Sequence, residues 1–293
     1  MILLTGATGL VGAALLPRLL SEGREVRCLV REPRRLGPNR VRVQITLGDL
    51  GDAVSLRQAV RGVDTVVHLA ATIRDQPGGS IEELNGIATV RLLRAAERAG
   101  VSRFVFFGAI GAVPSSPARF FRAKALATRA VLDARLDSRV LSPSIVYAPG
   151  DRFLTLLERM SLLPWMPVAG KGLAAFQPIW AQDVAGCVLA ALDRDLPIVR
   201  ERALELAGPD SLTYEQIVRL VLEARGRSRP LVHVPLGLVR RSLRTIERLS
   251  SNPFATWEEA QLMEMPMIAS RGTEDARTLG ADPKPMAEVL GLQ

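Results

Sequence analysis

Cysteine, lysine, tyrosine and histidine are all scarce in this chain of 293 residues. Its two cysteines, Cys28 and Cys187, each lie inside an apolar run, which indicates buried, reduced thiols rather than a disulfide. Reduced cysteines are typical of a cytoplasmic protein, and we expect that location. No metal site is predicted.

Long hydrophobic runs are also missing. Arg and Glu interrupt the apolar positions, and uncharged runs such as MSLLPWMPVAG, residues 160–170, are shorter than the ~20 apolar residues that span a bilayer. The chain begins with the strand-like MILLT and shows neither a basic leader nor a cleavage site, so no signal peptide is expected.

The net charge of +8 comes almost entirely from arginine, because only Lys124, Lys171 and Lys284 are lysines. A basic chain favours nucleic acid or an anionic membrane as partner. Here the arginines are scattered among Glu and Asp, and no basic run contains interleaved aromatic residues. We therefore predict no specific nucleic-acid partner, and assign the excess charge to a solvated surface and an anion site.

Short apolar runs alternate with helical patterns through the first half of the chain. Strands are predicted at Ile2–Thr5, Val26–Val30, Val41–Leu47, Thr65–Ala70, Phe104–Phe107 and Val140–Val146. Helices are predicted at Leu10–Glu22, Ala53–Arg61, Ile81–Ala99 and Ala118–Arg135, with Gly23 and Gly100 just past two of the helix ends. This alternation predicts an α/β fold with a doubly wound parallel sheet, covered on both faces.

The pattern changes after residue 150 and becomes helix-rich. Helices are predicted at Arg152–Leu163, Asp183–Leu192, Tyr214–Ala224, Leu236–Leu249 and Thr256–Met263, and a strand at Leu204–Ala207. We divide the chain into a nucleotide-binding domain, residues 1–150, to which residues 178–207 return, and a smaller substrate-side lobe formed by residues 151–177 and 208–293.

The stretch GATGLVG carries three glycines, Gly6, Gly9 and Gly12, directly after a strand and at the start of a helix. In a Rossmann domain such glycines permit a tight turn, the approach of a pyrophosphate, and close packing of helix on strand. The free N–H groups of the helix then face the phosphates. Thr8, Leu10 and Val11 complete this predicted dinucleotide site.

The end of the second strand, CLVREPRRL, favours NADP(H) over NAD(H). NAD sites usually place a carboxylate there to accept from the ribose 2′-hydroxyl, whereas this chain has Arg31, with Arg35 close behind. A guanidinium suits a 2′-phosphate and also stacks on adenine. The alternative is that these arginines belong only to a solvated loop and contact no nucleotide.

In combination these motifs resemble a short-chain dehydrogenase/reductase of the extended or atypical kind. The resemblance is carried by TGATGLVG, by GDL at 48–50, by VVHLAA at 66–71 and by ELNGIATVRLLRAAERAGVSRFVFFGA. Later stretches, among them LSPSIVYAPGDRFLTLLERM and LGADPKPMAEVL, resemble the branch of the NDUFA-nine accessory subunit of respiratory complex I and its bacterial relatives.

The resemblance implies roles for matching residues. Asp49 and Leu50 would contact the adenine, and Asn85 would stabilise the central helix near the site. The other implied nucleotide contacts are Leu69, Ala70 and Ala71 on the ribose side, Pro143 and Ile145 beside the nicotinamide, and Lys124 on the nicotinamide ribose. His68, inside a strand, is interpreted as a buried structural residue.

Two of the three catalytic groups of this family are missing. A Tyr four residues before the Lys normally exchanges the proton, and a Ser or Thr orients the substrate. Here Lys124 is present, but Phe120 stands at the Tyr position and Gly108 or Ala109 at the Ser position. Losing general acid–base catalysis typically costs ~10²–10⁴-fold in rate. Tyr147, Ser115, Ser116 and Ser144 are alternative donors. Family members often have an aromatic residue at the Tyr147 position for packing, and the serines are better explained as loop or cap residues.

The second lobe is expected to line an apolar substrate region with LLPWMPVAG, Phe153, Trp165 and Phe176, or simply to pack between the lobes. The helix 236–249 is amphipathic, with arginines filling its polar side. Such a helix lies on an anionic membrane surface or packs on its own domain.

Three functions follow from these features. The first is an NADP(H)-binding protein with little standard dehydrogenase activity and a regulatory or assembly role. The second is an NAD(P)H-dependent reductase of a quinone-like or other apolar carbonyl compound that uses Lys124 or another proton donor. The third is a nucleic-acid or membrane-surface adaptor that uses the charge of +8. The partners left open are a protein and a membrane surface. The sequence leaves the oligomeric state open.

Overall fold

The computed structural model describes residues 1–193, 203–250 and 253–292, and within them seven parallel strands form the central sheet. In spatial order the strands are β11 (Ala203–Leu206), β6 (Asp137–Pro143), β5 (Arg103–Phe107), β4 (Thr65–His68), β1 (Ile2–Thr5), β2 (Val26–Val30) and β3 (Gln44–Leu47). The chain order therefore reverses between β1 and β4. This is the doubly wound Rossmann order, in which ligands bind at the carboxyl ends of strands beside the reversal.

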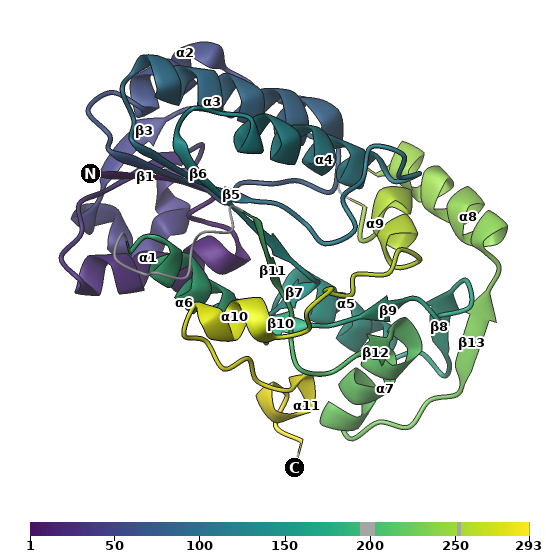
Figure 1. Ribbon diagram of the computed structural model, residues 1–293. Coiled ribbons are helices and arrows are strands. Elements are labelled where there is room, and N and C mark those ends of the chain that lie inside the picture. Colours follow the sequence, from purple (N-terminus) through teal and green to yellow (C-terminus); the bar gives the residue numbers. More distant parts are fainter. Residues whose placement is uncertain (194–202, 251–252, 293) are drawn as a thin grey trace.

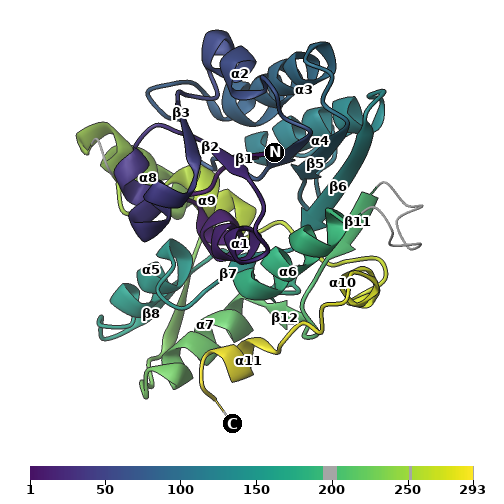
Figure 2. The same ribbon diagram turned by 90° about the vertical axis from the view of Figure 1, so that its left-hand side faces the viewer.

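Helices cover both faces of the sheet (Figures 1 and 2). One face carries α2 (Ala53–Ala59), α3 (Ala88–Arg98) and α4 (Arg119–Leu132), and the other carries α1 (Leu10–Ser21), α6 (Ala181–Ala191) and α10 (Glu274–Thr278). Strands that are covered twice must be apolar on both sides, and every residue of β1 and of β5 is buried. The predicted fold is confirmed.

Glycines end two of these helices as predicted. Gly23 and Gly100 have φ angles of 71° and 74°, in the left-handed region that a C-terminal cap requires. The strand predicted to begin at Val41 begins instead at Gln44, because residues Pro33–Arg42 form a 3₁₀ segment. The strand predicted at 140–146 is β6, which ends at Pro143.

The helix predicted over residues 81–99 contains a π turn at Glu83–Ile87 before α3 begins. The buried Asn85 lies in this turn and donates from Nδ2 to the carbonyl oxygens of Thr72 and Ile81, at 2.7 and 2.8 Å. Its Oδ1 accepts from the backbone N–H of Thr72. A π turn of this kind often marks a functional site, and here it fixes the loop that follows β4.

The remaining elements form a smaller lobe with its own apolar core. Its helices are α5 (Arg152–Met160), α7 (Tyr214–Ala224), α8 (Leu236–Leu249), α9 (Trp257–Leu262) and α11 (Met286–Val289). Its short strands are β7 (Val146–Tyr147), β8 (Met166–Ala169), β9 (Ala175–Phe176), β10 (Ile179–Trp180), β12 (Leu212–Thr213) and β13 (Leu231–Val234), paired β7 with β10, β9 with β12 and β8 with β13.

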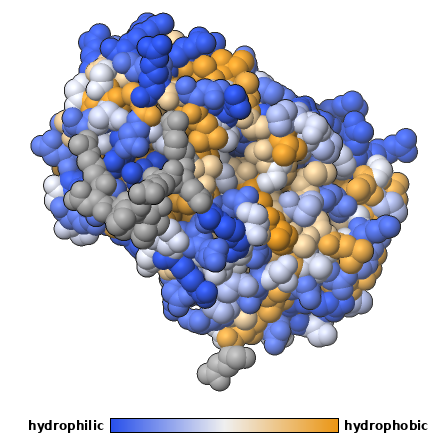
Figure 3. Space-filling view, viewed as in Figure 1, coloured by the Kyte–Doolittle hydropathy of each residue, from blue (hydrophilic) through white to orange (hydrophobic). Residues whose placement is uncertain are grey.

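The predicted division into two parts stays a prediction, but the packing gives it a physical outline. Phe176, Ile217 and Val218 belong to the core of the smaller lobe. Ala276 and Leu279, although late in the sequence, pack with α1 and α6 against the sheet. In Figure 3 apolar surface runs across the middle of this face, between the sheet and the smaller lobe.

Candidate functional site

A cavity of about 1200 Å³ lies between the carboxyl ends of the strands and the smaller lobe. Ligand pockets usually measure ~300–1,000 Å³, so it has room for more than one small ligand. It brings together every residue predicted for the nucleotide site: Gly6, Thr8, Gly9, Leu10, Val11, Gly12, Arg31, Arg35, Asp49, Leu50, Leu69, Ala70, Ala71, Lys124, Pro143 and Ile145. Their individual binding roles stay predictions.

The glycine loop joins β1 to α1 in a conformation that side chains would block. Gly6 has a φ of 77°, and a Cβ there would lie 2.6 Å from the backbone nitrogen of Ala70. A Cβ on Gly12 would lie only 2.1 Å from the Gly6 carbonyl oxygen. Gly9 precedes the helix without a side-chain cap, so no side chain occupies the first N–H groups of α1. The loop therefore fits a pyrophosphate.

The adenine side of the cavity carries a loose ion pair. The Arg31 Nη1 atom lies 3.6 Å from Oδ2 of Asp49, and the Arg31 side chain is 53% exposed. Asp49 also accepts from the backbone N–H of Gly51 at 2.8 Å through Oδ1. Arg35 lines the same rim. Arg31 and Arg35 thus both line the cavity, and the preference for NADP(H) stays a prediction.

Lys124 is 1% exposed and points from α4 to the end of β5. Its Nζ donates to the carbonyl oxygen of Phe107 at 2.6 Å and lies 4.8 and 5.8 Å from the ring centroids of Phe106 and Phe120. Burial lowers the pKa of Lys124 to about 7. The group therefore exchanges its proton near neutral pH.

Phe120 and Ala109 line the cavity together with Lys124. Phe120 is half-buried, one helical turn before Lys124 on the same side of α4. A Cβ at Gly108 would lie 2.5 Å from Oγ of Ser142, so a side chain is accommodated at Ala109 and not at Gly108. The structure is thus consistent with Phe120 at the Tyr position, four residues before Lys124, and with Ala109 at the Ser position.

The other candidate groups serve the fold. His68 is fully buried, its Nδ1 lies 2.6 Å from Oγ1 of Thr5, and burial lowers its pKa to about 3. The Ser144 hydroxyl lines the cavity but donates to the Met267 carbonyl oxygen at 2.7 Å. Tyr147 is buried away from the cavity wall. Both cysteines are buried and free, as predicted.

Trp165 and Phe176 were expected on the substrate side and do not line the cavity, since Trp165 is 44% exposed and Phe176 lies in the core of the smaller lobe. Phe153, Pro167 and Ala169 do line it. Sequence reasoning missed a whole wall, formed by α8, α9 and the segment between them: Val239, Leu243, Phe254, Ala255, Glu259, Ala260, Leu262 and Met263.

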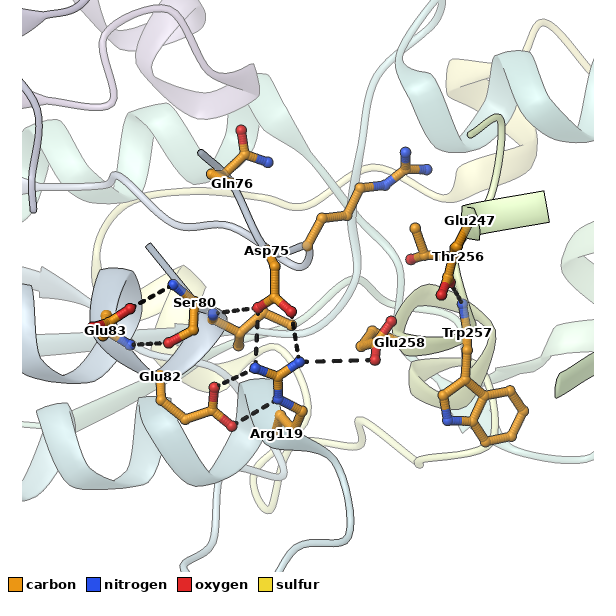
Figure 4. Close-up of polar contacts among 12 residues, drawn as sticks. Asp75, Gln76, Ser80, Glu82, Glu83, Arg119, Glu247, Thr256, Trp257 and Glu258 are labelled. Atoms are coloured by element: carbon orange, nitrogen blue, oxygen red, sulfur yellow. Dashed lines mark hydrogen bonds and ion pairs between the residues drawn. The ribbon is translucent and has the colours of Figure 1, made fainter. Parts of the chain in front are cut away.

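Ion pairs hold this wall against the sheet domain (Figure 4). Arg119, at the start of α4, contacts Asp75 at 2.9 Å and Glu82 at 2.6 Å, with Glu258 of α9 at 3.9 Å. Arg74 pairs with Glu259 at 2.5 Å and donates to the Pro253 carbonyl oxygen. The carboxylate of Glu259 is thereby neutralised, and the substrate end of the cavity is left predominantly apolar.

The amphipathic helix α8 uses part of its apolar side within the molecule. Leu243 is buried and Val239 lines the cavity, while Arg240 stacks over Trp257 at 5.5 Å. This packing accounts for the hydrophobic periodicity, although Leu249 stays 83% exposed. Within the described ranges no helix is long and apolar enough to cross a membrane, and no His, Cys, Asp and Glu side chains cluster as metal ligands.

Known proteins resemble the chain over most of its length. A sequence profile of NAD(P)H-binding proteins matches residues 6–144. The chain is 30% identical to NADH dehydrogenase [ubiquinone] 1 alpha subcomplex subunit 9 of Arabidopsis thaliana, over 74% of this chain and 56% of that one. It is also 30% identical to sterol demethylase protein B of Methylococcus capsulatus, over 81% and 78% of the two chains.

Solved structures share the fold at lower identity. The structure of MoeE5 in complex with UDP-glucose and NAD superposes with a TM-score of 0.71 over 100% of this chain and 96% of that chain, at 20% identity. The likeness extends the fold assignment to the smaller lobe. The chain spans little more than half of the plant subunit, so that protein's role is not transferred by the alignment.

Proposed function

The chain belongs to the short-chain dehydrogenase/reductase family, in the atypical group that resembles subunit 9 of complex I, and from this we propose that it binds NADP(H) with little of the standard carbonyl chemistry. One observation carries the proposal. The complete glycine loop shares a cavity with Phe120 and Ala109, where the family's Tyr and Ser would stand. A bound nucleotide would then be a structural or redox-sensing element.

In this role the protein would regulate or help to assemble another component, which is a protein or the anionic face of a membrane. The exposed arginines of α8, among them Arg241 and Arg248, support such a partner. The two buried free thiols support a place of action in the cytoplasm.

The first test is calorimetric titration of nucleotide-free protein with NADPH and with NADH. We expect micromolar NADPH binding, with NADH at least ~10-fold weaker because it lacks the charge that Arg31 and Arg35 would meet. Gly12→Ala should abolish binding, because its Cβ would overlap the Gly6 carbonyl oxygen. Gly237→Ala, a matched change at a helical glycine with open space around it, should bind normally. Absence of binding by both nucleotides would contradict the proposal.

A second candidate is a reductase of a quinone-like or other apolar carbonyl compound, favoured by the surroundings of Lys124. Nicotinamide would supply the hydride when bound. The Lys124 ammonium would give its proton to the substrate oxygen, since its pKa of about 7 suits a general acid at neutral pH.

This candidate predicts a specific pH profile. The acid is the protonated amine, so kcat should be level below pH 7 and fall ~10-fold per pH unit above it. Lys124→Met should remove turnover of a ubiquinone analogue while NADPH still binds, as measured by calorimetry. Lys171→Met, at an exposed lysine, is the control. A rate that is indifferent to pH, or to the loss of Lys124, would exclude Lys124 as the acid.

A further inference from the structure

Part of the cavity is walled by apolar side chains of the smaller lobe, and we call this part the chamber. Elements of the smaller lobe wall it: Leu157 and Met160 of α5, Pro167 of β8, Val234 of β13, and Leu262 and Met263 around the end of α9. Such a chamber suits the hydrocarbon part of a ligand. The polar residues that the smaller lobe adds to the cavity lining include Tyr214, together with Arg152 of α5 and Glu259 of α9.

Tyr214 is the first residue of α7, and its position is tightly set. Its backbone N–H donates to the Ala174 carbonyl oxygen at 3.0 Å, and Thr213 before it forms a capping box with Gln216. The side chain is 7% exposed and lines the cavity. No contact in the described part of the chain supplies its hydroxyl with a hydrogen-bond partner, and its pKa is shifted by burial and charge alone.

The surroundings keep this phenol protonated. Burial, and secondly the nearby Glu264 carboxylate, raise the pKa of Tyr214 to about 12. Glu264 comes from the loop after α9, and its side chain packs against Gly170, where a Cβ would lie 2.2 Å from Oε1. The raised pKa keeps the hydroxyl protonated at neutral pH, so it can donate a hydrogen bond.

Packing alone does not account for a tyrosine here. A phenylalanine ring fills the same space. The Tyr214 hydroxyl is not among the enclosed, unpaired side-chain atoms of the described residues, so it reaches open space, where water or a ligand can pair with it. Buried tyrosines usually find a partner for the hydroxyl. Tyr147, in contrast, has an enclosed, unpaired hydroxyl and does not line the cavity. The position of Tyr214 on the cavity wall is what distinguishes it.

We propose that the ligand of this chamber is an elongated apolar molecule with an oxygen-bearing group at the end away from the nucleotide, and that the Tyr214 hydroxyl donates a hydrogen bond to that group. Lys124 of α4 and Tyr214 of α7 both line the cavity, and α4 lies in the upper half and α7 in the lower half of the molecule in both views (Figures 1 and 2). The proposal rests on the proposed function in that it places the nucleotide at the α4 end.

The test uses methyl ketones that differ in two ways. Their chain length increases from octanone to hexadecanone, and each length is used with and without a hydroxyl on the last carbon. NADPH-loaded protein is titrated with each by calorimetry. Beyond the length that reaches Tyr214, the terminal hydroxyl should strengthen binding by ~2- to 10-fold, the worth of one neutral hydrogen bond. Tyr214→Phe should remove this gain and leave the plain ketones unchanged. Tyr147→Phe is the matched control and should keep it.

Equal gains from the terminal hydroxyl in natural protein and in Tyr214→Phe would overturn the proposal, as would the failure of every ketone to bind protein that holds NADPH. If Tyr214→Phe does not fold, the length series on the natural protein decides. A terminal hydroxyl that strengthens ketone binding at no length, or equally at every length, also overturns the proposal. Failure of NADPH to bind would refute the proposed function separately, and repeating the ketone titration without nucleotide still tests Tyr214.

Discussion

Introducing a phenol at position 120 should raise NADPH-dependent reduction of an apolar ketone by ~10²–10⁴-fold, the usual worth of a general acid. Phe120→Tyr places a hydroxyl one helical turn before Lys124, whose Nζ already lies 5.8 Å from the Phe120 ring centroid. The side chain lines the cavity, so the added oxygen has space. A neighbouring ammonium also favours ionisation of the new phenol.

Adding Ala109→Ser should raise the rate further, because a hydroxyl there can orient the carbonyl oxygen. Ala109 lines the cavity, whereas Gly108 has no room for a side chain. The measurement is NADPH oxidation under saturating nucleotide, followed with a long-chain methyl ketone and with a ubiquinone analogue.

Phe153→Tyr is the matched control, since it introduces a phenol elsewhere on the same cavity wall. It should leave the rate unchanged. If Phe120→Tyr, Ala109→Ser binds NADPH and reduces no carbonyl compound faster than the natural protein, the lost Tyr and Ser do not explain a low activity. The interpretation that Phe120 stands in the place of the catalytic Tyr would then be wrong.

The nucleotide half of the site was predictable because its determinants are local in sequence. A strand, GATGLVG and a helix must form a tight turn wherever they occur, since the contacts between Gly6 and Gly12 are six positions apart. The strand–helix alternation likewise fixes a parallel sheet and brings its carboxyl ends to one edge. Leu69 directly after β4, Arg31 directly after β2 and Pro143 at the end of β6 therefore meet in one cavity.

The wall made by α8 and α9 was not predictable from the same reasoning. It depends on the contact between Arg74 and Glu259, 185 positions apart, and each residue by itself looks like a solvated charge. Periodicity indicated that α8 is amphipathic, but it does not say whether Leu243 faces a membrane, a core or a cavity. The capping box of Thr256 with Glu259, seen in the structure, fixes the start of α9 and does not determine which element α9 packs against.

Removing the two arginines at the adenine rim should weaken NADPH binding by ~100-fold or more and leave NADH binding nearly unchanged. A hydrogen bond to a charged group contributes ~1.5–3 kcal/mol, which is about 10- to 100-fold for each arginine that contacts a 2′-phosphate. The pair between Arg31 and Asp49 is 3.6 Å long and half exposed, so releasing it for a phosphate costs ~1 kcal/mol or less.

Arg34→Ala provides the matched control for Arg31→Ala, Arg35→Ala. Arg34 lies between the two in sequence, is exposed, and does not line the cavity. Its loss should change the NADPH dissociation constant by the small factor that a distant surface charge contributes, and added salt should erase that factor. Titrations of the three proteins with both nucleotides give the preference as a ratio of dissociation constants.

The ratio separates the two chemical roles that an arginine can have at this rim. Recognition of a 2′-phosphate weakens NADPH alone, because NADH has a hydroxyl at that position. Stacking of a guanidinium on adenine weakens both nucleotides equally, since they share the base. Equal weakening would therefore refute the preference for NADP(H) and would still keep Arg31 in the site.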